Sequence, residues 1–120
     1  MNEPKVLNRK IVPAETVLFR EGDIANTAYL LKKGRVEIWI DKQGEKVVLS
    51  TIRKNQIFGE LALVDGSPRS ANATVMTESE VILVSRHALE LQIEKLDDFM
   101  KFWVNHLTKQ VRNLTQKLEE

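Results

Sequence analysis

The stretch FGELALVDGSPRSANATV, residues 58–75, decides how this sequence is interpreted. An apolar run is interrupted by Gly59 and Glu60, resumes for four residues, and ends in a turn that contains glycine and proline. Arg69 follows that turn and stands among small residues. A carboxylate and a guanidinium therefore flank one short helical turn and one tight loop, with little side-chain bulk around them.

The residue types in this stretch suit an anion that is joined to a sugar. The first amides of a helix have no internal acceptors and attract a phosphate. Gly59 lets the backbone approach a ligand closely, and Arg69 presents a planar fork of donors to the same anion. Glu60 is an acceptor when ionised and fits a pair of sugar hydroxyls. The alternative from local chemistry alone is a surface ion pair between Glu60 and Arg69, contributing about 0–1 kcal/mol.

Short β-strands separated by turns surround this stretch. Their predicted ranges are 16–20, 27–33, 35–40, 45–52, 71–77 and 79–85. Many short strands at this spacing are typical of a sandwich, jelly roll or barrel. The sequence thus predicts a mainly β fold, an antiparallel, jelly-roll-like β-roll over residues 11–85, and we expect the polar residues 1–10 to be loosely held.

The hydrophobic period changes after Ser85, which is suited to cap a helix beginning at Arg86. Asp97 and Asp98 are typical of the acidic start of a second, long helix that runs to the chain end. In this second helix apolar residues recur at 4–3 spacing, as in a coiled-coil seam: Met100, Val104, Leu107, Val111, Leu114 and Leu118. Such a face either packs on its own domain or pairs with a second copy, and we expect a homodimer through residues 97–120.

The composition is that of one soluble globular domain covering residues 1–120. Eighteen basic residues against 17 acidic ones give a formal charge of +1, which removes the usual electrostatic case for non-specific nucleic-acid or membrane binding. The last helix ends at Glu119 and Glu120 with no DNA-reading element after it, so we expect no direct DNA binding. No apolar run is long enough for a signal peptide or a membrane insertion, and a cytoplasmic location is expected.

The sequence offers little for metal or covalent chemistry. It has no cysteine, which excludes a disulfide framework, a thiolate zinc site and a cysteine nucleophile. Its two histidines, His87 and His106, fall in the predicted helices at no recognisable ligand spacing. We therefore expect no metal site and no enzyme of the metal-dependent β-roll type.

The motif of Gly59 to Leu63, a short turn, and then Pro68 to Ala71 resembles the phosphate-binding cassette of cyclic-nucleotide-binding domains. That family includes the catabolite activator protein, the regulatory subunits of cyclic-AMP-dependent protein kinase and the cyclic-nucleotide-gated channels. The resemblance covers most of the chain, because Phe19 to Asp23 resembles the family's early turn and residues 29–38 resemble its paired strands around a glycine. The cassette then spans residues 58–71, and the helical arm of residues 86–120 corresponds to the family's B helix and long C helix.

The resemblance implies a role for each cassette residue. Arg69 would contact the exocyclic oxygens of the cyclic phosphate, and Glu60 would accept from the ribose 2′-hydroxyl with support from the Gly59 amide. Backbone amides near Ala62 and Ala71 would complete the cradle. The implied nucleotide-binding set is Gly59, Glu60, Leu61, Ala62, Arg69, Ser70 and Ala71. The implied base contacts are Ile38, Leu49 and Phe58, any of which could equally be core, and Thr115 on the last helix, with Arg112 or Asn113 as weaker candidates.

The resemblance also bears on which nucleotide binds. Ser70 either imitates the threonine that favours cyclic GMP in the family or binds phosphate, as serine does in bacterial cyclic-AMP members. Guanine selection commonly uses an acidic residue well along the last helix, whereas this helix has carboxylates only near its two ends. We therefore expect cyclic AMP as ligand, with cyclic GMP second, and no cofactor.

The expected function is a cytoplasmic, non-enzymatic cyclic-nucleotide sensor. It would transmit binding through its C-terminal helices to an output partner that the sequence does not identify. The alternative is a structural β-roll dimerisation domain whose nucleotide pocket is non-functional.

Overall fold

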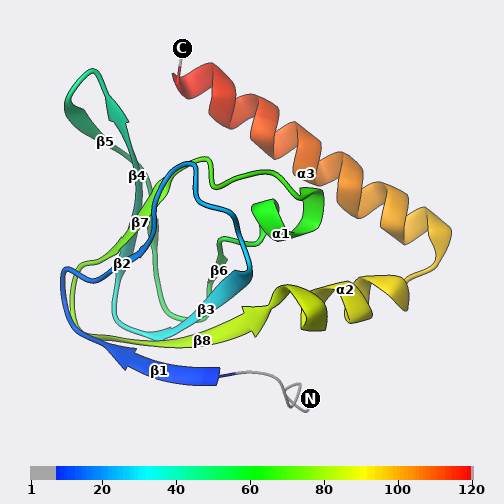
Figure 1. The fold of residues 1–120 in the computed structure, drawn as a ribbon, viewed down its shortest axis with the longest axis horizontal. Helices are drawn as coiled ribbons and strands as arrows, with labels where there is room; N and C mark the ends of the chain where they lie inside the picture. The colour runs from blue at the N-terminus through cyan, green and yellow to red at the C-terminus, as the bar shows by residue number, and fades with distance from the viewer. Residues whose placement is uncertain (1–7, 120) are drawn as a thin grey trace.

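The structure, a computed structural model, describes residues 8–119, with the side chains of residue 65 and of residues 115–119 outside the description. It is mainly antiparallel β with helices at the C-terminal end, as the sequence predicts (Figure 1). The elements are β1 Asn8–Val12, β2 Val17–Phe19, β3 Thr27–Lys33, β4 Val36–Lys42, β5 Glu45–Ile52, β6 Ile57–Phe58, α1 Leu61–Asp65, β7 Asn72–Val75, β8 Ser79–Ser85, α2 Arg86–Glu94 and α3 Asp98–Glu119.

The β-roll consists of two four-stranded sheets, one in the order β1-β8-β3-β6 and the other in the order β2-β7-β4-β5. Both sheets supply the core, because each strand turns alternate side chains inward. In β7, for example, Ala73 and Val75 are buried while Asn72 and Thr74 are half-buried. The most deeply buried side chains include Leu31 and Val36, which stand on either side of the turn between β3 and β4.

Gly34 occupies that turn with φ of +108°, in close contact with the start of β8. A Cβ atom at this position would lie 2.0 Å from Ser79 Oγ and 2.8 Å from Ser79 Cα. Ser79 is itself buried and bonded, since its hydroxyl accepts from Arg35 N at 3.2 Å and donates to Thr77 O at 2.7 Å. The turn that connects the two sheets is thereby fixed to the first residue of β8.

The N-terminal strand corrects one expectation. Residues 8–10 are not loosely held, because they belong to β1, which pairs antiparallel with β8 from Asn8↔Leu83 to Val12↔Ser79. This pairing uses backbone groups, so the polar composition of the segment gives no sign of it. Residues 1–7 lie outside the described part of the chain.

Both C-terminal helices begin where the sequence predicts. The Ser85 hydroxyl accepts from Ala88 N at 3.1 Å at the start of α2, and Asp97 Oδ1 accepts from Met100 N at 2.8 Å at the start of α3. Figure 1 shows α2 continuing from β8, after which the chain turns and α3 passes back across α1. Within the described residues, no helix has the length and apolar character needed to cross a membrane.

The apolar positions of α3 divide into two faces. Met100 and Val104 are half-buried and Thr108 is 5% exposed, on the side where α3 packs against α1. A second face is exposed to solvent and consists of Phe99, Phe102, Trp103, Leu107, Val111 and Leu114. The predicted 4–3 seam is therefore split between these two faces, and Leu118 lies outside the described side chains.

Candidate functional site

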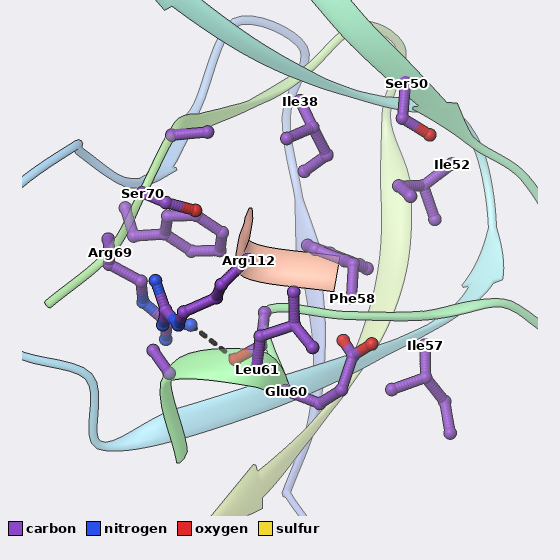
Figure 2. A pocket seen from close by; sticks show the side chains of 14 residues that line it. Ile38, Ser50, Ile52, Ile57, Phe58, Glu60, Leu61, Arg69, Ser70 and Arg112 are labelled. Carbon is purple, nitrogen blue, oxygen red and sulfur yellow. Dashed lines mark hydrogen bonds between the residues drawn. The ribbon is translucent and has the colours of Figure 1, made fainter. Parts of the chain in front are cut away.

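A cavity of about 260 Å³ lies where the β-roll, α1 and α3 meet (Figure 2). Its volume is close to the lower end of the range of about 300–1,000 Å³ that is typical of small-molecule sites. The residues that line it are Phe19, Ile38, Ser50, Ile52, Ile57, Phe58, Gly59, Glu60, Leu61, Ala62, Arg69, Ser70, Ala71 and Arg112. All seven cassette residues singled out in the sequence therefore lie on the wall of one cavity.

Gly59 and Glu60 form the entry to α1. Gly59 has φ of +75°, and a Cβ atom there would lie 2.8 Å from Arg69 Nη1 and 3.1 Å from Phe19 Cε2, so only glycine fits without displacing the arginine. Glu60 occupies the N-cap position of α1, but its side chain makes no capping hydrogen bond. Its carboxylate is thus left to face the cavity.

Arg69 is buried, with 5% of its surface exposed, and it is held from three sides. Nη1 donates to the Gly59 carbonyl and Nη2 donates to the Thr27 carbonyl. The guanidinium carbon lies 4.0 Å from the centroid of the Phe19 ring, in cation–π geometry. Within the described residues the Nε atom is buried and has no hydrogen-bond partner. A buried donor without an acceptor costs about 1–3 kcal/mol, so the site favours an acceptor that arrives with a ligand.

The backbone on both sides of Arg69 is fixed by the loop of residues 20–23. Gly22 N donates to Arg69 O and Arg69 N donates to Asp23 O, each at 2.8 Å. Asn72 extends this clamp, because its side-chain oxygen accepts from Glu21 N at 2.8 Å and its Nδ2 donates to Trp39 O at 3.3 Å. Asn72 has no assigned role in the sequence-based interpretation, and only its position between β4 and the loop of residues 20–23 shows what it does.

Glu60 and Arg69 do not form the surface ion pair considered as an alternative. Figure 2 shows the Glu60 carboxylate on the side of Phe58 and Ile57, with the Arg69 guanidinium at the opposite end of the cavity. No salt bridge joins the two side chains in the described part of the structure. The cavity therefore has a guanidinium at one end and a carboxylate at the other.

Burial sets the electrostatics of both groups. It raises the pKa of Glu60, against the opposing effects of a backbone hydrogen bond and of Arg69. It lowers the pKa of Arg69, an effect opposed by Tyr29, Asp23 and Glu60 and reinforced by Arg112. An arginine remains protonated at any physiological pH, so Arg69 carries a partly desolvated positive charge into the cavity.

The apolar end of the cavity differs in part from the sequence-based interpretation. Ile38 and Phe58 line it, and so do Ser50, Ile52 and Ile57, which were not singled out. Leu49 is not among the lining residues, because β5 carries a bulge at that point and Ser50, not Leu49, pairs with Ile38. Because side chains alternate along a strand, residue 50 lies on the same face as Ile52, and this alternation would have indicated Ser50 as a cavity residue.

The terminal helix also contributes a residue. Thr115, the candidate base contact on this helix, lies outside the described side chains. Arg112, a weaker candidate in the sequence, lines the cavity from α3.

Residues 9–95 match the family model of the cyclic nucleotide-binding domain. The chain belongs to this family of regulatory, ligand-binding domains. Over 110 residues it is 31% identical to the anaerobic regulatory protein of Bacillus subtilis, with 87% of this chain and 46% of the relative covered. It is 34% identical over 89 residues to a cyclic nucleotide-gated potassium channel of Rhizobium etli, with 74% of this chain and 23% of the relative covered. The chain thus spans less than half the length of these curated relatives.

Solved structures of the EAL enzyme Bd1971 have the same fold. The cAMP-bound form has a TM-score of 0.84 at 26% identity, covering 93% of this chain and 30% of that one. The cGMP-bound form has a TM-score of 0.85 at 28% identity, covering 92% and 30%. One fold of this kind therefore occurs with either nucleotide, and the fold alone does not distinguish them.

Proposed function

We propose that this chain is a sensor module that binds cAMP in preference to cGMP and transmits binding through α2 and α3. The observation that carries the proposal is Arg69, a buried guanidinium on a cavity wall with an unpaired Nε donor, facing Glu60 across the cavity. A cyclic phosphate would supply the missing acceptor, and the ribose would reach the carboxylate. The proposed unit is the whole of residues 1–120, with the cassette at 58–71 and the arm at 86–120.

The preference for cAMP is supported by what lines the cavity. Among the described residues, its lining contains one carboxylate, Glu60, which the ribose would occupy. Guanine carries amino and imide donors that need an acceptor such as a second carboxylate, and Ser50 is the remaining polar side chain at the apolar end. The adenine ring needs fewer hydrogen-bond acceptors from this lining, and its faces pack well against Ile38, Phe58 and other apolar side chains.

A change in α3 is the proposed output of binding. The helix packs on α1, which follows the cassette glutamate directly, and it reaches the cavity through Arg112. A ligand shifts a conformational equilibrium only through its different affinity for the two states, and contact with both α1 and α3 would provide that difference. We propose a cytoplasmic module without a catalytic step, a cofactor or direct DNA binding, whose output partner remains to be identified.

Calorimetric titration with cAMP and with cGMP tests the function. We expect saturable binding of one nucleotide per chain with cAMP the tighter ligand; a micromolar dissociation constant would correspond to about 8 kcal/mol. Tighter binding of cGMP would reverse the assigned preference. Failure of both nucleotides to bind would leave the structural dimerisation domain as the function, which the exposed apolar face of α3 favours.

The pH dependence of binding follows from the raised pKa of Glu60. Protonation removes acceptor capacity from the carboxylate, and the raised pKa moves that loss to a higher pH than for an exposed glutamate. We expect the affinity for cAMP to fall as the pH drops from about 8 to about 5, because the empty site binds a proton that the ligand must displace.

Glu60→Gln is the matched control for this pH profile. The variant should bind cAMP more weakly at pH 8, and its affinity should be nearly constant over the same range. His87 and His106 remain in the variant, so a profile that keeps its full slope would assign the pH effect to another group.

The exposed face of α3 is the proposed site of homodimerisation. Trp103 and Leu107 are each 48% exposed and Leu114 is 62% exposed, more apolar surface than a monomer usually leaves on one helix. The predicted seam of the helix is divided accordingly, because Met100 and Val104 face their own domain while Leu107 and Leu114 face solvent.

Sedimentation velocity checks the dimer. We expect the unmodified chain to sediment as a dimer and Leu107→Glu to sediment as a monomer, because the substitution places a charge in the proposed apolar interface. Lys109→Glu is the control, since residue 109 is exposed and stands about 200° around the helix from residue 107. A monomer in both the unmodified chain and the variants would reject the interface.

A further inference from the structure

Two arginines from distant parts of the chain line the same cavity. Arg69 comes from the cassette, and Arg112 comes from α3. Figure 2 shows the Arg112 side chain extending from the helix toward the end of the cavity that holds Arg69, and away from Ser50 and Ile57. The sequence-based interpretation made Arg112 a weaker candidate for the base, whereas its direction points to the other end of the ligand.

The two guanidinium groups are close enough to influence each other. Arg112 adds to the effect of burial in lowering the pKa of Arg69. Two like charges in a partly desolvated cavity repel each other more strongly than in water. An anion placed between them would turn this unfavourable interaction into two favourable ones.

The position of Arg112 is set by the packing of α3. Thr108, one helical turn earlier, is 5% exposed, and its hydroxyl donates to Val104 O at 2.8 Å. The side of α3 that carries Val104 and Thr108 is the one packed toward α1, and residue 112 continues it by one more turn. Arg112 therefore reaches the cavity only when α3 lies against the domain as it does here.

We propose that Arg112 is a second phosphate-binding residue, which shares the nucleotide phosphate with Arg69 and so holds α3 against the cassette. The inference rests on the proposed function and deepens it. The phosphate, which every cyclic nucleotide has in common, is then the group through which α3 responds to ligand. The base would determine affinity and selectivity without determining the position of the helix.

Titration of the full chain and its variants with two nucleotides separates a phosphate contact from a base contact. Arg112→Gln should weaken cAMP and cGMP by the same factor, about fivefold, because both ligands carry the same phosphate. A base contact would instead weaken the two ligands unequally, because adenine presents an amino donor where guanine presents a carbonyl acceptor. Arg112→Lys, which keeps the charge, should restore part of the lost affinity, and Lys109→Gln should bind as the unmodified chain does.

Hydrogen exchange gives a second measurement on the same proteins. Binding of cAMP should slow amide exchange in residues 98–114 of the unmodified chain, and the slowing should be smaller in Arg112→Gln at equal saturation. Unequal losses for the two nucleotides, or unchanged affinity and unchanged protection in Arg112→Gln, would overturn the role of Arg112 while leaving the proposed function in place. Absence of cAMP and cGMP binding to the unmodified chain would reject the function itself.

Discussion

Arg69→Gln is expected to weaken cAMP binding at least tenfold, a loss of about 1.4 kcal/mol or more. The variant loses the positive charge that would face the phosphate and the Nε donor that is buried without a partner in the described structure. Hydrogen bonds to charged groups contribute about 1.5–3 kcal/mol each, so the loss of one such contact already reaches the expected threshold. Calorimetric titration measures the effect directly.

The same substitution also tests how much Arg69 contributes to the fold. Glutamine cannot donate to both the Gly59 and the Thr27 carbonyls in the geometry that Arg69 uses, and an unsatisfied buried acceptor costs about 1–3 kcal/mol. Removal of a partly desolvated charge offsets some of this cost. Because the substitution is expected to lower stability, the titration is made well below the melting temperature of the variant, where the variant is folded. Arg53→Gln is the control, because Arg53 is exposed and does not line the cavity. Equal affinities for Arg69→Gln and Arg53→Gln would end the assignment of Arg69 to the phosphate.

Gly34→Ala is expected to destabilise the β-roll by about 2–5 kcal/mol, the sum of the strain of positive φ in a residue with a side chain and the cost of overpacking. The new Cβ would meet Ser79 Oγ at 2.0 Å and the Ser79 backbone at 2.8 Å, so a side-chain rotation at Ser79 cannot remove the overlap. The turn between β3 and β4 would have to move away from β8. Denaturant unfolding followed by circular dichroism gives the free energy of unfolding.

Gly44→Ala provides the matched comparison. Gly44 also has positive φ, +86°, but a Cβ atom there would meet nothing within 4 Å. This variant isolates the backbone strain, about 1–2 kcal/mol, from the contact with Ser79. Equal losses for Gly34→Ala and Gly44→Ala would show that the close approach of the turn to β8 contributes nothing beyond φ.

Local sequence patterns were sufficient for much of the fold. The alternation of apolar residues predicted strands 27–33, 45–52 and 79–85 with the bounds that the structure shows. Ser85 was predictable as a helix cap because capping depends on a residue and the three that follow it. The placement of the cassette residues on one cavity wall was predictable for a similar reason, since Gly59 and Arg69 are separated by only one short helix and one turn.

Features that depend on distant partners were not predictable in this way. Strand pairing with β8 places residues 8–10 in β1, although their own composition is polar. The bulge in β5 places Ser50 instead of Leu49 opposite Ile38. No residue type in the strand indicates that a bulge occurs there. Arg112 reaches the cavity because α3 folds back over α1, an arrangement that the helix sequence alone does not specify.

The backbone at Arg69 is clamped by Asn72 and the loop of residues 20–23. This clamp has a consequence for the thermodynamics of binding. Because the clamp fixes the backbone at the arginine before any nucleotide enters, association does not have to order this part of the cassette, and little conformational entropy is lost there. Under the proposed function, the interaction energy gained at the phosphate would then be available to reposition α3. In the proposed sensor, a fixed cassette coupled to a movable α3 would direct the free energy of binding to the helix that transmits the signal.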